Sequence, residues 1–157
     1  MLEAEYNETA PVKFHILLVD DSEGEARLFT ESLRQAAPRV NLYWVATAAE
    51  GLEFLNRQNR FQDVGQADIV VCDLNMPGMS GFDFLKRVKG DSMLKRLPVI
   101  MYSGSSHARD VEICYTLGAN AYLVKAMTPE GMVEQLKTLV HFWLESAKLP
   151  TALAGLD

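Results

Sequence analysis

The fold of this chain is decided by residues 68–81, which read Asp68-Ile69-Val70-Val71-Cys72-Asp73-Leu74-Asn75-Met76-Pro77-Gly78-Met79-Ser80-Gly81. The apolar, β-branched start of this stretch predicts a buried strand, and the Pro and Gly that follow predict a turn. Asp73 stands where the strand gives way to the turn. Because ligands of open parallel sheets bind outside the carboxyl ends of the strands, Asp73 is a candidate site residue. Taken alone, it could equally be an Asp that starts a turn.

Three other apolar runs also end in polar residues. The run 14–19 ends in Asp20 and Asp21, the run 97–102 in Ser103, and the run 120–124 in Lys125. Adjacent carboxylates repel each other, so a fold rarely places two of them at a strand end for stability. Carboxylates at neighbouring strand ends would form an oxygen-rich pocket that suits Mg²⁺.

The spacing of apolar residues predicts an alternation of five strands and five helices. Such a (βα)₅ chain forms an α/β fold, a doubly wound parallel five-stranded sheet that is covered on both faces. Two helices begin with capping-box patterns, Ser22 with Glu25 and Thr47 with Glu50, and Thr128-Pro129 starts the last helix. Gly118 is a helix-ending signal. The predicted strands are 14–19, 40–45, 69–73, 98–102 and 120–124, and the later helices are 81–90, 107–117 and 129–147, with a polar loop over 57–67.

Composition narrows the function further. The chain has 157 residues, which suits one domain, and a net charge of −6 without an evident basic patch. An acidic surface is repelled by phosphate backbones, so we expect no nucleic-acid partner. No apolar run approaches the ~18 residues that span a bilayer, so we expect no membrane partner either. The two cysteines lie in buried patterns, which suits a reducing cytoplasm.

These motifs together resemble the receiver domain of two-component response regulators, which has a flavodoxin-like fold. The resemblance covers residues 13–148, between a flexible acidic arm at 1–12 and a short tail at 149–157 with no output domain. The segment Phe142-Trp143-Leu144-Glu145-Ser146-Ala147-Lys148-Leu149-Pro150 is similar to stand-alone regulators that partner bacterial phytochromes. The resemblance therefore implies that the partner is a sensor histidine kinase of the phytochrome type.

The resemblance also implies a role for each site residue. Asp73 would be the phosphoacceptor, and Mg²⁺ would be held by Asp20, Asp21, Asp73 and the backbone carbonyl of Asn75. Lys125 and Ser103 would contact the phosphoryl oxygens, and Tyr122 would be the rotating aromatic residue of the switch. Apart from its own phosphotransfer and dephosphorylation, such a protein is not an enzyme.

One residue departs from the family pattern. Ala126 follows Lys125 where the family usually has a proline after a cis bond. A cis bond before a non-proline residue costs ~3–4 kcal/mol, against ~0.5–1 kcal/mol before proline. We therefore expect a trans bond unless the site enforces the cis form.

Two other functions are weighed against the regulator. An aspartyl-phosphate phosphohydrolase would resemble relatives that carry a second Asp two residues after the nucleophile as general acid, but Asn75 stands there and cannot transfer a proton. A flavin carrier would need a phosphate-cradling loop after the first strand, where Asp20 and Asp21 would repel a phosphate.

The last helix carries more apolar residues than one core-facing stripe requires. We expect a homodimer through helix four, strand five and the last helix, with Leu139, Phe142 and Trp143 in its interface. The alternative is that Phe142 and Trp143 cap the core of their own domain.

Overall fold

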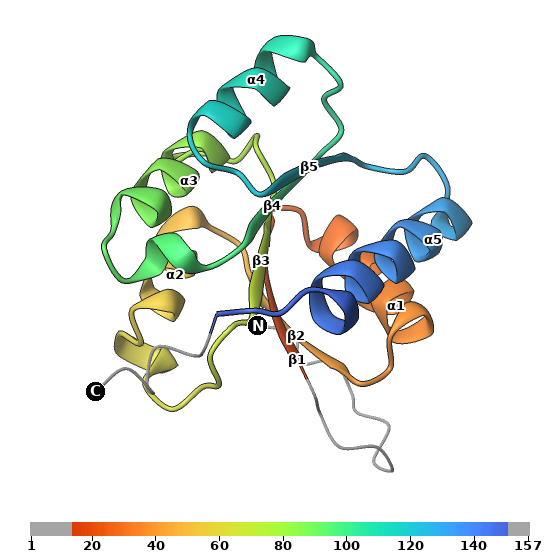
Figure 1. The fold of residues 1–157 in the computed structure, drawn as a ribbon, viewed down its shortest axis with the longest axis horizontal. Helices are drawn as coiled ribbons and strands as arrows, with labels where there is room; N and C mark the ends of the chain where they lie inside the picture. The colour runs from red at the N-terminus through yellow and green to blue at the C-terminus, as the bar shows by residue number, and fades with distance from the viewer. Residues whose placement is uncertain (1–13, 151–157) are drawn as a thin grey trace.

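Five parallel strands form one sheet with helices on both of its faces, as predicted (Figure 1). The computed structural model describes residues 14–150, so the predicted arm at 1–12 and most of the tail lie outside the described residues. In chain order the elements are β1 (Phe14–Val19), α1 (Glu23–Ala36), β2 (Val40–Val45), α2 (Ala48–Leu55), η1 (Asn59–Phe61), β3 (Ile69–Cys72), α3 (Gly81–Gly90), η2 (Leu94–Arg96), β4 (Val99–Ser103), α4 (Ala108–Thr116), β5 (Ala121–Val124), α5 (Pro129–Val140) and η3 (His141–Ser146).

The strand order β2-β1-β3-β4-β5 brings the predicted site residues together. Val19 of β1 is in register with Cys72 of β3, so the next residues, Asp20 and Asp73, leave the sheet side by side. Ser103 of β4 is in register with Val124 of β5, directly before Lys125. Four side chains far apart in the sequence therefore share one edge of the sheet, the edge at which α/β folds bind ligands.

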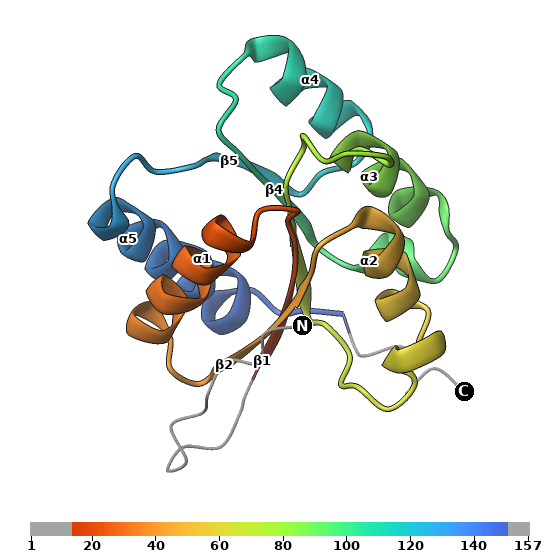
Figure 2. The same cartoon turned by 180° about the vertical axis from the view of Figure 1, so that it is seen from behind.

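Alternating side chains of the strands supply two apolar layers. In β1, Ile16 and Leu18 pack beneath α1 and α5, whereas Leu17 and Val19 pack on the opposite face beneath α2 and α3. Figure 2 shows the two helical layers from behind, with α1 and α5 on one side of the sheet and α2 and α3 on the other. Because both faces are covered, the strands are largely apolar, as expected for a parallel sheet. Among the described residues, none of the helices is both long enough and apolar enough to cross a membrane.

Most predicted boundaries agree with the structure to within one residue, and two regions differ. The stretch 57–67, predicted as a loop, contains the 3₁₀ turn η1, whose Phe61 is fully buried against Phe54. The predicted helix over 129–147 is α-helical only to Val140 and continues as the π-helical η3, where the Ala147 N–H donates to the Phe142 carbonyl at 2.7 Å. Periodicity predicts that a helix continues but not how tightly it is wound.

Candidate functional site

Two buried carboxylates form the floor of the site. Asp20 is 3% exposed and Asp73 is 7% exposed. One oxygen of each is held by the chain itself: Asp73 Oδ1 accepts the Leu74 N–H at 2.8 Å, and Asp20 Oδ1 accepts the Ser22 N–H at 2.9 Å. Burial raises the pKa of both carboxyl groups above their ordinary value, although the nearby Lys125 opposes this. The second oxygen of each is left for a charged partner.

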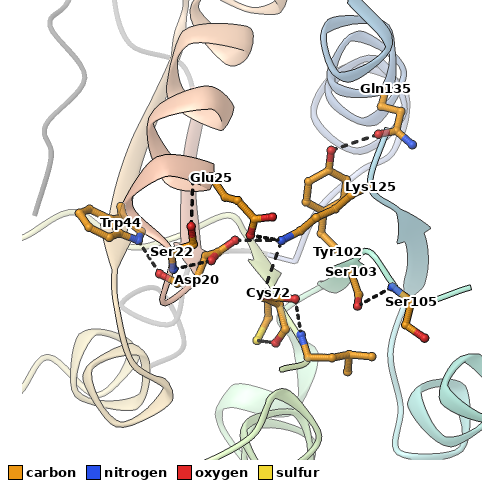
Figure 3. Close-up of polar contacts among 12 residues, drawn as sticks. Asp20, Ser22, Glu25, Trp44, Cys72, Tyr102, Ser103, Ser105, Lys125 and Gln135 are labelled. Atoms are coloured by element: carbon orange, nitrogen blue, oxygen red, sulfur yellow. Dashed lines mark hydrogen bonds and ion pairs between the residues drawn. The ribbon is translucent and has the colours of Figure 1, made fainter. Parts of the chain in front are cut away.

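Lys125 is that partner, and it serves three carboxylates at once (Figure 3). Its Nζ lies 2.7 Å from Glu25 Oε2, 3.2 Å from Asp20 Oδ2 and 3.5 Å from Asp73 Oδ2. Burial alone would lower the pKa of Lys125, but the hydrogen bond to Glu25 and the charges of the two aspartates outweigh it and raise this pKa. The ammonium is therefore charged at neutral pH, and three carboxylates face one cation.

Glu25 is the site residue that the sequence did not reveal. The first half of the predicted capping box is present, because the Ser22 Oγ accepts the Glu25 N–H at 3.2 Å. The second half is not: the Glu25 side chain turns to Lys125 instead of back to the helix start. The one indication in the sequence is the position of Glu25 in the first helical turn after β1, at the same edge of the sheet as Asp20.

The carboxylates fit a hard divalent cation. Asp20, Glu25 and Asp73 each offer an oxygen, and these oxygens lie within 4.8 Å of one another. Oxygen ligands and an excess of negative charge are what Mg²⁺ requires. Asp21, a predicted ligand, is exposed and lies outside this set, and its side chain makes no hydrogen bond or ion pair with the described residues.

An open hollow gives a ligand access to these groups. Its lining includes Asp73, Lys125 and Ser103, together with the predicted ligand Asn75. The backbone beneath Asp73 is closely packed: a Cβ on Gly81, at the start of α3, would lie 2.1 Å from the Asp73 carbonyl oxygen. Only glycine fits that contact, so Gly81 lets α3 begin directly against the strand end that carries Asp73.

Comparison with known proteins identifies this arrangement. Residues 16–137 match the family described as the response regulator receiver domain. The chain belongs to this family. It is 31% identical over 146 residues to the response regulator Rcp1 of Synechocystis sp., an alignment that covers 93% of this chain and 99% of Rcp1. The resemblance that the strand-end motifs indicated is thereby confirmed.

Solved structures of receiver proteins agree with the fold. The phosphorylated cyanobacterial phytochrome response regulator RcpA has a TM-score of 0.82 and 29% identity, with 88% of this chain and 99% of that chain covered. The Mn²⁺-bound form of Rcp1 has a TM-score of 0.79 and 30% identity, with the same coverage. This receiver is thus related to phytochrome-associated response regulators.

Ser103 and Tyr122 of this receiver meet at the β4–α4 loop. Ser103 is buried, and its Oγ accepts the Ser105 N–H at 3.2 Å. The Tyr122 hydroxyl donates to the Ser105 carbonyl at 2.7 Å. Ser105 therefore connects the hollow to the Tyr122 ring on β5, and the Tyr122 hydroxyl bonds to Ser105 and not to Asp73.

The three candidate interface residues of the receiver differ in exposure. Leu139 is only 5% exposed and belongs to the core beneath α1 and α5. Trp143 is partly buried against that core and meets Phe142 edge-to-face, with ring centroids 5.1 Å apart. Phe142 is 54% exposed. Of the three, Phe142 is the one whose surface remains open to a partner.

Proposed function

We propose that this response regulator is phosphorylated on Asp73 in a Mg²⁺-dependent reaction with a sensor histidine kinase of the phytochrome type as the donor. The observation that carries the proposal is the position of Asp73 Oδ2, which is free of backbone bonds, faces Lys125 at 3.5 Å and opens into the hollow. The relatedness to Rcp1 and RcpA supports the class of kinase.

The chemistry asks for little covalent work from the protein. Asp73 Oδ2 attacks phosphorus, the bond from phosphorus to the donor's histidine nitrogen breaks, and the imidazole leaves with that electron pair. Lys125 neutralises charge on the transferred group, and Ser103 Oγ offers it a hydrogen bond. Asp20, Glu25 and Asp73 would hold Mg²⁺, with Asp21 and Asn75 at the rim, and the bound ion supplies further charge neutralisation.

Lys125 changes partner in this proposal. In the unphosphorylated chain its shortest contact is with Glu25, at 2.7 Å. A phosphoryl group on Asp73 carries more negative charge than the carboxylate it replaces and competes for the same ammonium. Glu25 therefore loses Lys125 as its partner when Asp73 is phosphorylated, and its carboxylate at the first turn of α1 is left to the metal and to solvent. The Ser103–Ser105 and Ser105–Tyr122 hydrogen bonds link the phosphorylated site to α4 and β5.

Output takes place through protein contacts on that side. We propose a homodimer through α4, β5 and α5 with Phe142 at its centre, supported by the exposure of this ring and by the largely apolar hollow that Phe142 and Trp143 line with Leu123. The buried, free Cys72 and Cys114 support a cytoplasmic setting beside the kinase.

Sedimentation of the wild type and Phe142→Ser tests the proposed dimer. A wild type that stays monomeric with and without beryllium fluoride contradicts it.

The phosphorylation site is tested with acetyl phosphate and Mg²⁺, followed by intact mass. The wild type should gain one phosphoryl group, and Asp73→Asn should gain none. Asp68→Asn is the matched control, because Asp68 precedes the same strand and accepts the His15 N–H at 2.8 Å at its opposite end. A phosphorylated Asp73→Asn protein would overturn the assignment.

A further inference from the structure

We propose that Gln135 of α5 is a positioning residue for Lys125, an inference that rests on the proposed function of Lys125. The two peptide groups that flank Lys125 both bond to the Gln135 side chain. Its Nε2 donates to the Val124 carbonyl at 2.7 Å, and its Oε1 accepts the Ala126 N–H at 3.1 Å. One amide therefore brackets the lysine from both sides.

A third bond fixes the backbone between them. The Lys125 N–H donates to the Ser103 carbonyl at 2.8 Å, which continues the pairing of β5 with β4. The carbonyl of residue 124 and the N–H groups of residues 125 and 126 are thus all held, where β5 has ended and α5 has not yet begun. These three consecutive hydrogen bonds restrict the position of the Lys125 Cα and therefore the direction in which its side chain leaves the backbone.

The bracket depends on the residue that departs from the family pattern. Ala126 has a backbone N–H to give to Gln135, whereas a proline in its place would have none. The described residues contain no cis peptide bond, so the Lys125–Ala126 bond is trans. The hydrogen bonds of the Gln135 side chain thereby fix this loop, which has no proline to fix it.

Gln135 also holds the ring beside the ammonium. The Tyr102 hydroxyl donates to Gln135 Oε1 at 3.1 Å, and the Lys125 Nζ lies 5.8 Å from the centroid of the Tyr102 ring (Figure 3). Tyr102 precedes Ser103 on β4 and is buried. The same amide therefore fixes both the backbone of Lys125 and an aromatic face along which its side chain extends toward Asp73.

The test compares Gln135→Met, which keeps length but loses the bonds, with Glu134→Gln, a neighbouring exposed position, as control. With acetyl phosphate and Mg²⁺, we expect Gln135→Met to be phosphorylated about tenfold more slowly than the control, since small displacements of a charge-stabilising group slow a reaction markedly. The Mg²⁺ dissociation constant should be unchanged, because the three carboxylates are untouched. Trp44, whose indole N–H donates to the Asp20 carbonyl at 2.7 Å, is a fluorescent reporter for that titration.

If Gln135 acts through Lys125, the effects of substituting the two residues on the phosphorylation rate should not add. In a Lys125→Ala background, Gln135→Met should cause no further loss of rate, whereas a general structural defect would add its full effect. Gln135→Leu, which also lacks the three hydrogen bonds, should show the same loss and serves if Gln135→Met folds poorly. An unchanged rate in Gln135→Met, or an equal loss in both backgrounds, would overturn the inference. Failure of the wild type and the control to be phosphorylated would instead refute the proposed function.

Discussion

Lys89 and Lys125 are both partly buried lysines, at opposite ends of the sheet, and their partners differ in kind. Lys89 Nζ donates to the Lys95 and Leu97 carbonyls at 3.1 and 2.7 Å and to Asn120 Oδ1 at 2.9 Å, all uncharged acceptors. Lys125 Nζ meets three carboxylates. Burial lowers the pKa of Lys89, whereas the carboxylates raise the pKa of Lys125.

The difference separates a structural lysine from a functional one. Lys89 has three N–H donors and three acceptors, so it joins α3, the η2 turn and the start of β5 in a finished arrangement. Around Lys125 the negative charges outnumber the positive one, which leaves the region able to accept a cation and to exchange partners. An arrangement with unbalanced charge is costly to fold and is characteristic of a site that binds something.

The largest expected effect is on the phosphorylation rate, when the amine of Lys125 but not that of Lys89 is removed. Lys125→Met should slow phosphorylation about 100-fold, because a preorganised charge-stabilising donor is lost. Lys89→Met should leave the rate unchanged but lower the free energy of unfolding by about 1 kcal/mol, because three partly or fully exposed acceptors lose their shared donor. Acetyl phosphate kinetics and urea unfolding measure the two. Equal rates for both variants would contradict the distinction between the lysines.

Neutralising Glu25 should have a smaller effect, in the opposite direction. Glu25→Gln frees Lys125 from its shortest ion pair and removes one charge that repels a phosphate donor. At saturating Mg²⁺ we expect phosphorylation to be about fivefold faster, a modest change because the Glu25 side chain is partly exposed and its charge is screened. The Mg²⁺ dissociation constant should rise.

The control for Glu25 lies two residues earlier. Glu23 is in the same helical turn, is exposed and pairs with Arg27 at 2.6 Å. Glu23→Gln should change neither the rate nor the affinity for Mg²⁺. A Glu25→Gln protein that is phosphorylated more slowly than the wild type would show that Glu25 assists the reaction instead of competing for Lys125.

The smallest expected effect concerns stability without metal. Because burial raises the pKa of Asp73, its ionisation opposes folding as the pH rises above the unfolded-state value, and the penalty is complete above the raised value. In chelator at pH 7, Asp73→Asn should therefore be more stable by about 1 kcal/mol. Below the unfolded-state value near 3.8, where Asp73 is protonated in both states, the gain should vanish. A gain that is the same at pH 3 and pH 7, measured by thermal unfolding, would contradict this.

Sequence reasoning found the residues that strand register brings together. Asp20, Asp73, Ser103 and Lys125 each follow or end an apolar run, and parallel strands align such ends without further information. It placed the helices for the same reason, since their periodicity is local.

It could not find Glu25 or Gln135, because their roles depend on contacts with residues distant in the sequence or on another element. Local rules assign Glu25 to a capping box, and only the packing of α1 beside the end of β5 turns it toward Lys125. Likewise, the apolar pattern of the last helix does not reveal which of its side chains the core buries. The pattern predicts Leu139 and Phe142 in one interface, but Leu139 is buried and Phe142 is exposed.

The central claim is that Lys125 passes from Glu25 to the group on Asp73, and carboxyl and lysine side-chain NMR with beryllium fluoride and Mg²⁺ tests it most directly. With Mg²⁺ already present, adding beryllium fluoride should shift the Lys125 ammonium and Glu25 carboxyl signals while Glu23 stays fixed, and Asp73→Asn should abolish both shifts. Binding of beryllium fluoride at Asp73 that leaves the Glu25 and Lys125 signals unchanged would contradict the account.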